Sequence, residues 1–309
     1  MKKIILMAGL TGAMLTSCND SAFLREKPED FLTVDNFKTG VNQMYSQVRA
    51  LYNSNEGPTD WIIMGVGTDV FMIPRGDGTD QAYNDWARVY PTDGISSRYW
   101  SAFYGIIKNC NELLYQIKNP NVVWYVPGQK EEIQAEILFF RAYAYRGLAN
   151  LFGGVPILLD PVVSPKLDYV RSSRVETYQQ AIRDAEYAAE FLPKELKADG
   201  QVTRATADHL LSELYIALSD NGGEKSYDKA IQAATRVLDG TDGDYGLMTK
   251  RFGSRAGEVD KNVYWDLFRM GNQNYKEAGN KECLWAVQFA YNTPGGTNDY
   301  GRPLIERTF

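Results

Sequence analysis

The sequence predicts a mainly α-helical protein in which helix pairs stack into an α–α superhelix, joined by irregular loops and a few short strands. Three observations lead to this prediction. Apolar residues recur at helical spacing through residues 131–152. Three later segments each begin after a Ser or Thr in an N-cap position. After residue 240 the helical pattern gives way to loops and short alternating runs such as residues 284–287.

Residues 1–17 are typical of a lipoprotein signal peptide. Lys2 and Lys3 precede an apolar run over residues 4–15, which is shorter than the ~20 residues that a membrane-spanning helix needs. The run ends in Leu-Thr-Ser-Cys, which fits a bacterial lipobox, and we expect Cys18 to be lipidated and to become the new N-terminus. A secreted protein without an anchor is the alternative. Because two acyl chains suffice for stable anchoring, we expect contact with the membrane through this lipid.

The first helix is expected after a polar segment. Residues 18–36 are polar and charged and predict a lipid-anchored tether with an extended entry segment. Residues 37–240 form the predicted helical domain, and residues 241–309 a loop-rich segment. A helix is predicted over residues 35–52, with an apolar stripe of Phe37, Val41, Met44, Tyr45, Val48 and Leu51.

Two long helices are predicted to form an antiparallel hairpin. The first covers residues 95–118 and the central one begins near Glu131. The central helix carries one stripe and a second apolar row, so we expect neighbours on more than one side, and its small residues permit close approach. It ends at Gly153-Gly154 and Pro156. The stripe and row are Ile133, Ile137, Phe140, Ala144, Leu148 and Leu151, with Phe139 and Tyr143.

Three further helices follow a linker at residues 160–169. Ser173 with Glu176 predicts a capping box, and Thr203 and Ser226 are predicted N-caps. Stacked helix pairs of this length are similar to degenerate tetratricopeptide repeats. The apolar stripes predicted for the last two helices are Ala207, Leu211, Leu214 and Leu218, then Tyr227, Ala230, Ile231, Ala234 and Leu238.

Charge and cysteine content exclude some classes of partner. Removing residues 1–17 changes the formal net charge from −6 to −8, because it removes two lysines and no acid. That acidity argues against nucleic acid and against electrostatic docking on anionic lipid. Cys110 and Cys283 remain after processing. They could pair in an exported protein, but we expect free, buried thiols.

The sequence offers little for catalysis, a metal or a cofactor. His209 is the only histidine and lies within a predicted helix, where a surface or half-buried role is expected. With no second histidine and no close cysteine pair, a zinc site is not predicted. No G-x-S-x-G elbow is present. Carboxylate pairs for glycoside hydrolysis stay open, since 39 acidic residues allow many pairs. We predict no catalytic residues, no metal and no cofactor.

Aromatic residues in loop-rich segments indicate binding instead. The chain has 20 Tyr and six Trp, several of them away from helix stripes. Aromatic faces stack on sugar rings while neighbouring polar groups bind hydroxyls, although each ring could equally anchor its own loop. The predicted ligand-binding residues are Trp86, Tyr90, Asn84, Tyr264, Trp265, Tyr291 and Asn292.

The central helix also carries a recognisable pattern. Residues 135–156 contain AE-x-x-FFRA-x-x-Y-x-x-L followed by FGGVP, which resembles the signature of the SusD/RagB family of outer-membrane nutrient-binding lipoproteins. Thr203 departs from the family pattern, which usually has Gly there, and we expect a different entry turn. Further matches are Trp100, Tyr104 and Asn111; Arg171 and Asp184; Arg204, Ala205 and Thr206; and Glu282, Trp285 and Gln288.

The resemblance implies a function without bond chemistry. It implies an outer-membrane lipoprotein facing the cell exterior that binds a nutrient, most often a glycan, and passes it to a SusC-like TonB-dependent transporter. Peptide ligands stay open. Family members continue well beyond residue 309, so the chain resembles a truncated copy whose C-terminal segment is incomplete. The alternatives are a lipid-anchored helical-repeat scaffold for other proteins and an all-helical glycosidase.

Overall fold

The computed structural model describes residues 33–52, 68–69, 83, 86, 89–90, 92 and 94–289. The signal peptide, Cys18, Asn84, Tyr291 and Asn292 lie outside these ranges. The helices within them are α2 (Val34–Tyr52), α5 (Gly94–Gln116), α6 (Gln129–Phe152), α7 (Arg174–Phe191), α8 (Arg204–Asp220), α9 (Tyr227–Leu238), α10 (Val263–Leu267) and α11 (Tyr275–Ala278).

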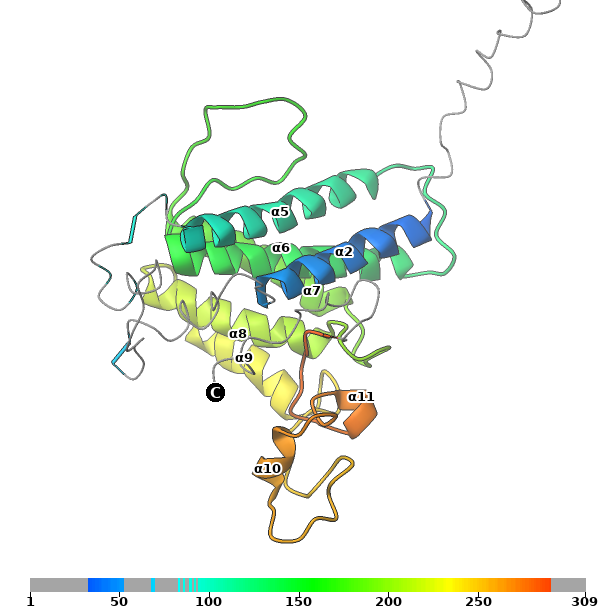
Figure 1. Cartoon of the computed structure of the whole chain (residues 1–309). Coiled ribbons are helices and arrows are strands. Elements are labelled where there is room, and N and C mark those ends of the chain that lie inside the picture. The colour runs from blue at the N-terminus through cyan, green and yellow to red at the C-terminus, as the bar shows by residue number, and fades with distance from the viewer. Residues whose placement is uncertain are drawn as a thin grey trace, which may run out of the picture.

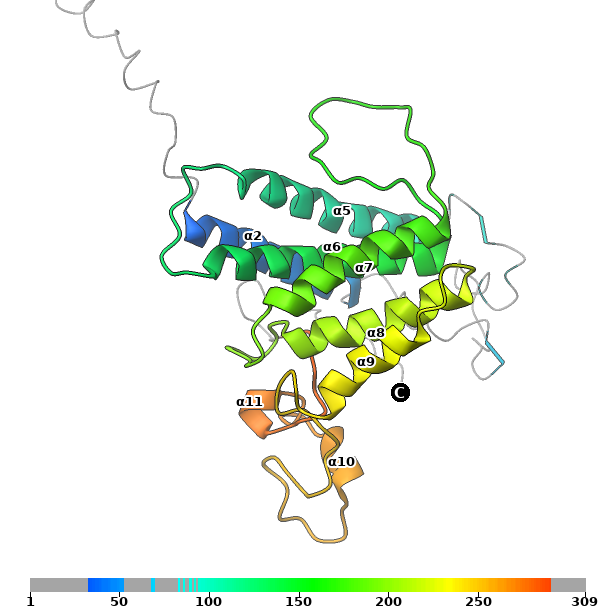
Figure 2. The same ribbon diagram turned by 180° about the vertical axis from the view of Figure 1, so that it is seen from behind.

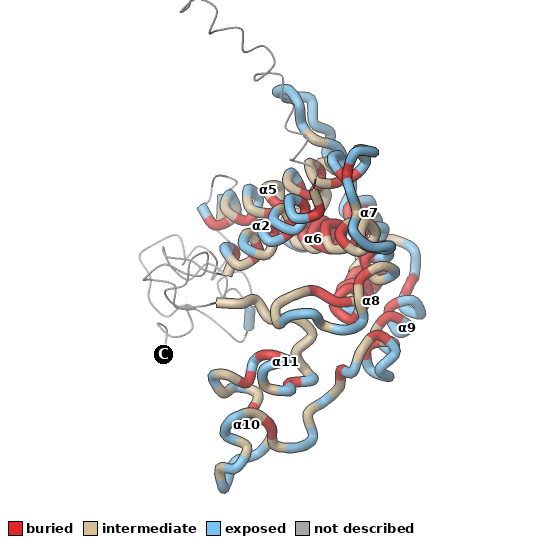
Figure 3. The backbone as a smooth tube through the Cα atoms, turned by 90° about the vertical axis from the view of Figure 1, so that its right-hand side faces the viewer, coloured by how far each residue is buried: buried red, intermediate tan, exposed pale blue. Residues whose placement is uncertain are grey.

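The long helices stack in layers around α6. Helices α2 and α5 pack on α6, and α7, α8 and α9 follow in sequence order, each beside the one before it (Figures 1 and 2). Helix α6 has twelve buried residues among its 24. Those residues lie on several faces, which confirms the prediction that the central helix has neighbours on more than one side. Figure 3 shows that buried residues concentrate in these helices. The predicted mainly α-helical stack is confirmed.

Leu151 is an exception to the predicted stripe of α6. Its side chain is 40% exposed, whereas Leu148 one turn earlier is fully buried. Helix α6 ends at Phe152, directly after Leu151. Spacing predicts which residues share a helix face, but it gives no information on how much of that face neighbouring elements cover.

Two glycines permit close approach around α6. A Cβ atom on Gly147 would lie 2.3 Å from Phe103 Cζ, so the ring of α5 lies directly over this glycine. A Cβ atom on Gly154 would lie 2.0 Å from the carbonyl oxygen of Ser172, in the segment that leads into α7. The Gly-Gly turn therefore ends α6 and also allows the segment before α7 to pack closely against Gly154.

A buried polar network joins α5, α6 and α7. Arg141 donates two hydrogen bonds to Asp184, at 2.7 and 2.8 Å, and a third to Asn111 Oδ1 at 2.9 Å. Asn111 in turn donates to the carbonyl of Leu158 at 2.9 Å, and Gln180 donates to Asp184 at 2.9 Å. These residues are 2–7% exposed, so each charge and amide is satisfied by the others.

All three predicted N-cap residues are the N-caps of their helices, although their side-chain hydrogen bonds differ. Ser173 Oγ accepts from the Glu176 N–H at 3.1 Å, and the Glu176 carboxylate accepts from the Ser173 N–H at 2.7 Å, which is the predicted capping box. Thr203 is the N-cap of α8. Ser226 precedes α9, but its side chain makes no capping bond and donates to the carbonyl of Glu224 instead. Ser226 is therefore the N-cap residue of α9 as predicted, but its hydroxyl does not cap the helix.

The buried face of α9 also differs from the predicted stripe. Ile231 and Leu238 are 63% and 72% exposed, while Ala233 and Val237 are buried. The residues that contact α8 are small, which lets the two helices lie close, and the larger apolar residues lie outside. Ala230 of the predicted stripe is buried as expected, but Ile231 and Leu238 are not, so the predicted stripe was rotated from the observed one.

The chain after α9 is irregular. Residues 284–289 run extended, but no strand is assigned to them or elsewhere in the described ranges, where an isolated bridge between Thr33 and Val123 is recorded. The expected short strand at residues 284–287 is thus an extended segment without a ladder. Among the helices of the described residues, none combines the length and the apolar character that crossing a membrane requires.

Both described cysteines are free. Cys110 is fully buried and its thiol contacts Met44 Sδ and the carbonyl of Ile137. Cys283 is half-buried, which confirms the expectation of a free thiol while correcting its expected burial.

Candidate ligand-binding site

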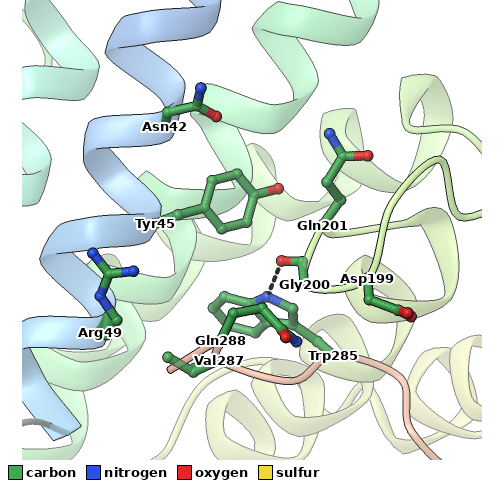
Figure 4. Close-up of a pocket in the computed structure, with 9 residues that line it drawn as sticks. All are labelled: Asn42, Tyr45, Arg49, Asp199, Gly200, Gln201, Trp285, Val287 and Gln288. Carbon is green, nitrogen blue, oxygen red and sulfur yellow. Dashed lines mark hydrogen bonds between the residues drawn. The ribbon is translucent and has the colours of Figure 1, made fainter. Parts of the chain in front are cut away.

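A pocket of about 190 Å³ lies between α2, the turn at residues 199–201 and the extended segment at residues 285–288. Figure 4 shows the side chains of α2 on one side and the turn on the opposite side, with Trp285 and Gln288 below. The lining residues are Asn42, Tyr45, Arg49, Asp199, Gly200, Gln201, Trp285, Val287 and Gln288. We refer to it as the Trp285 pocket.

Helix α2 contributes three side chains at spacings of three and four residues, which place Asn42, Tyr45 and Arg49 on one helix face. Tyr45 is fixed in position, because its hydroxyl donates to Glu136 Oε1 at 2.5 Å and accepts from the Val202 N–H at 3.0 Å. Burial and the neighbouring Glu136 raise the pKa of Tyr45 well above its usual value. The phenol is therefore neutral at physiological pH and acts as a hydrogen-bonding wall, not as a base.

Gly200 shapes the opposite wall. It has φ +89°, a left-handed conformation, and a Cβ atom there would lie 2.5 Å from Gln288 Cγ. Its carbonyl accepts a hydrogen bond from Trp285 Nε1 at 2.9 Å. Next to it, the Asp199 carboxylate accepts from the N–H groups of Lys276 and Glu277, at 2.8 and 3.0 Å, where α11 begins. The turn thus ties the extended segment and α11 to the helical stack.

Trp285 is held by aromatic edges. Its ring centroid lies 5.6 Å from Phe139 and 5.8 Å from Tyr143, with interplanar angles of 86° and 87°. Phe140 and Tyr45 contribute two more distant edges, at 6.2 and 6.4 Å. Such edge-to-face packing is favourable and defines the orientation of the indole. Because α2, α6 and the turn all hold it, the indole is a rigid wall.

Two polar side chains of the Trp285 pocket, the amides of Asn42 and Gln201, are not committed elsewhere among the described residues. Within that part of the chain no partner is recorded for either side-chain amide, although the Gln201 N–H donates to the carbonyl of Ala198 at 3.2 Å. The Arg49 guanidinium donates to Ser46 at 3.2 Å and has further interactions. Gln288 is already paired with Asn274, to which it donates at 2.9 Å. The two free amides each offer a donor and an acceptor, as hydroxyl groups require. The pocket therefore suits a small ligand rich in hydroxyl groups.

A second cavity of about 340 Å³ shares Trp285 as a wall. It contains an ion pair between Arg146 and Glu213, at 3.0 Å, and the exposed His209 at its edge. Cys283 also lines it, and burial raises the pKa of that thiol, which disfavours the reactive thiolate. Within the described part of the chain, no group of three or more His, Cys, Asp or Glu side chains is placed to hold a metal ion.

Two of the predicted ligand-binding residues lie on the segment before α5. The side chains of Trp86 and Tyr90 are 53% and 63% exposed. Trp86 has φ 59°, and its ring meets Tyr83 at 5.5 Å in an edge-to-face contact. Both rings remain candidates for stacking on a ligand.

Tyr264 and Trp265 lie next to each other on α10. Tyr264 is 67% exposed and meets Phe268 at 4.9 Å. Trp265 is half-buried, and four cationic groups lie within 5.8 Å of its ring centroid. Among the ring contacts of the described residues, none joins this pair to Trp86 or Tyr90. The predicted residues therefore form two separate groups, and neither group lines the Trp285 pocket.

The sequence interpretation missed the α2 wall because Tyr45 belongs to a core stripe and Asn42 and Gln201 carry no special pattern. A usable signal did exist. Trp285 and Gln288, which both line the pocket, belong to the E-x-x-W-x-x-Q match. An aromatic and a polar residue at this spacing, in a segment without helical periodicity, indicate a ligand-binding site as readily as a strand.

The chain matches one family model over residues 22–216, which is described as starch-binding and associating with the outer membrane and named SusD-like. Two SusD-like proteins of Formosa agariphila are also similar. P2 is 25% identical over 248 residues, covering 76% of this chain and 45% of that relative. P25 is 18% identical over 292 residues, covering 90% and 50%. The chain thus spans about half the length of these relatives.

Solved structures share the fold. A SusD superfamily protein from Bacteroides vulgatus aligns with a TM-score of 0.60 at 20% identity, over 70% of this chain and 45% of that one. A laminarin-binding SusD-like protein aligns with a TM-score of 0.56 at 23% identity, over 70% and 47%. The helical stack of this chain is therefore also present in these solved structures.

Proposed function

The chain belongs to the SusD-like family, and from this premise we propose that the protein binds a carbohydrate at the outer membrane without cleaving it. The family description supports both the ligand class and the membrane association. A structural neighbour described as laminarin-binding supports a glycan ligand as well. Because the chain spans about half of its relatives, the proposal concerns the site that this part of the protein provides.

The observation that carries the proposal is the composition of the Trp285 pocket. Tyr45 and Trp285 supply rigid aromatic walls, and Asn42 and Gln201 supply amides without partners. Sugar sites combine these two kinds of group. At about 190 Å³ the pocket is smaller than the roughly 300–1,000 Å³ typical of drug-sized ligands. It therefore fits a single sugar unit of a longer chain.

Aromatic residues outside the Trp285 pocket form the second part of the proposed binding site. Trp86 and Tyr90, before α5, and Tyr264 and Trp265, on α10, would bind further sugar units by stacking. Asn84, Tyr291 and Asn292 remain proposed polar and aromatic partners. The rest of a bound oligosaccharide would then lie outside the Trp285 pocket, over the body of the protein.

Binding without hydrolysis agrees with the chemistry of the described residues. Tyr45 keeps its proton because its pKa is raised, and Glu136, whose pKa burial also raises, is occupied by Tyr45. Neither group is free to activate water. We propose hand-over of the ligand to a SusC-like TonB-dependent transporter as the next step.

Affinity electrophoresis through gels containing laminarin, starch or dextran tests the proposed function. We expect retardation by at least one glycan and about tenfold weaker binding for the double variant Asn42→Ala/Gln201→Ala, since two hydrogen bonds contribute roughly 0.5–1.5 kcal/mol each. Gln116→Ala, an exposed amide on α5, is the control and should bind normally. Retardation that is identical in the double variant would exclude the Trp285 pocket. Trp86→Ala and Trp265→Ala test the extended site in the same gels.

The anchor is tested separately. We expect labelled fatty acid to be incorporated into the protein in cells and to be absent from Cys18→Ala. Detergent extraction of the labelled protein should recover a large barrel protein with it. Recovery of helical or soluble partners instead would favour a protein-interaction scaffold.

A further inference from the structure

Four cations surround a single indole on α10. The charged groups of Arg269, Arg255, Lys261 and Arg251 lie 4.4, 4.9, 5.5 and 5.8 Å from the ring centroid of Trp265. Elsewhere among the described residues each recorded ring carries a single cation. We refer to these four residues as the α10 cationic cluster.

Two members of the cluster are neutralised by acids and two are not. Arg251 pairs with the buried Asp266 at 2.6 Å, and Arg255 pairs with Glu258. Within the described residues, Lys261 and Arg269 have no ion-pair partner. The Nε of Arg269 is buried and has no hydrogen-bond acceptor. The cluster therefore keeps an excess of positive charge, and its repulsion would be relieved by a bound anion.

This positive charge lies on an acidic protein. The formal net charge of the chain is −6 at pH 7. A polyanion is repelled by the molecule as a whole, so its binding would report a local site. The negative net charge of the chain excludes the nonspecific attraction by which basic proteins bind polyanions.

The same short helix presents an aromatic surface next to the cluster. Tyr264 on α10 and Phe268, which directly follows the helix, have ring centroids 4.9 Å apart and are 67% and 63% exposed. Arg269, the next residue, lies over the ring of Trp265. Aromatic faces bind sugar rings, and arginine forks bind carboxylate and sulfate groups. A ligand with both features would engage both surfaces.

We propose that α10 and the loops on either side of it form a binding site for acidic sugars, carrying carboxylate or sulfate groups, in which Lys261 and Arg269 bind the anion and Tyr264 and Phe268 stack on the ring. This inference rests on the proposed glycan binding and adds a ligand class to it. Arg251 has a positioning role, because it also donates to the carbonyls of Glu258 and Lys261 at 2.7 and 3.1 Å and so shapes the loop.

The test compares acidic and neutral polymers on the same protein. Affinity gels containing polygalacturonate or dextran sulfate are run beside gels containing dextran, at low and at 0.5 M salt. We expect retardation by at least one acidic polymer, with about tenfold weaker binding for Lys261→Gln/Arg269→Gln and loss at high salt. The control Lys225→Gln removes the single cation over Tyr227 and should have no effect.

Two outcomes would overturn the inference. One is the absence of retardation by both acidic polymers at low salt. The other is equal retardation of the wild-type protein and the double variant. If Arg269→Gln disturbs the fold, Arg255→Gln/Lys261→Gln changes exposed side chains alone and should still weaken acidic binding. Retention of neutral-glycan binding by these variants would leave the Trp285 pocket standing, so the two proposals can fail separately.

Discussion

Single glycines determine how closely the helices of this protein pack. Gly147 and Gly105 are both helical, yet their surroundings differ. A Cβ atom on Gly147 would meet three atoms of the Phe103 ring within 2.7 Å, whereas on Gly105 it would meet only Gln47 Nε2 at 3.5 Å. A comparison of the two positions therefore distinguishes the effect of close packing from the effect of helix propensity.

We predict opposite effects for alanine at these glycines. Gly147→Ala should lower the free energy of unfolding by about 1–3 kcal/mol, because the core must shift to accept the methyl group. Gly105→Ala should leave it unchanged or raise it by up to about 1 kcal/mol, since alanine favours the helix. Urea unfolding monitored by circular dichroism measures both. Equal effects of the two substitutions would contradict the packing account.

A buried carboxyl gives the protein a specific dependence on pH. Asp242 is 2% exposed, and its Oδ2 lies 3.4 Å from Arg236 Nε without a hydrogen bond. Arg236 already pairs with Asp208 on α8. Burial, and then the neighbouring Asp208, raise the pKa of Asp242 to about 7. In the unfolded chain an aspartate titrates near ~3.9.

The folded protein therefore keeps this proton through a range in which the unfolded chain has lost it. The contribution of Asp242 to stability is full below about pH 4 and is lost as the pH rises through 7. We predict that Asp242→Asn flattens the fall in unfolding free energy between pH 4 and 7, measured by urea titration at each pH. Asp168→Asn, an exposed control, should keep the wild-type slope. An unchanged slope in Asp242→Asn would show that this carboxyl ionises normally.

At the scale of helices, a single arginine joins three of them. Arg141 on α6 meets Asp184 on α7 and Asn111 on α5, and all three are buried. Removing one partner from such a pair leaves the other charge buried and unsatisfied, which costs more than removing both.

We predict that Arg141→Met lowers the free energy of unfolding by about 3–5 kcal/mol. The double variant Arg141→Met/Asp184→Leu should recover part of that loss, because neither charge then remains. Recovery will be incomplete, since Gln180 and Asn111 also lose partners. Chemical denaturation of the two variants measures the difference. A double variant that is less stable than the single one would contradict this explanation.

Periodicity predicted the helices well and their surroundings less well. Helix α8 buries Ala207, Leu211, Leu214 and Leu218 as its spacing predicts, because it has neighbours on both sides. Helix α9 has α8 on one side, and small residues such as Ala233 occupy that contact. A pattern of large apolar residues therefore predicted the wrong face. Ser226 is the predicted N-cap residue of α9, but its hydroxyl donates to the carbonyl of Glu224 and does not cap the helix.

Over the whole molecule, the sequence predicted the stack more completely than the site. The central helix, its Gly-Gly end and the Ser173 capping box follow from local chemistry. The Trp285 pocket does not, because it joins residues 42–49 to residues 199–201 and 285–288. Nothing local in Tyr45 or Gln201 predicts that long-range meeting. The four cations around Trp265 were not predicted either, because the loop-rich context of this residue gave no sign of them.

The most direct test of glycan binding is a crystal structure of the protein with the oligosaccharide that the affinity gels select. We predict a sugar ring in the Trp285 pocket, with hydroxyl groups within hydrogen-bond distance of the Asn42 and Gln201 amides. An oligosaccharide bound elsewhere on the protein, with only solvent between Tyr45, Gln201 and Trp285, would contradict the account.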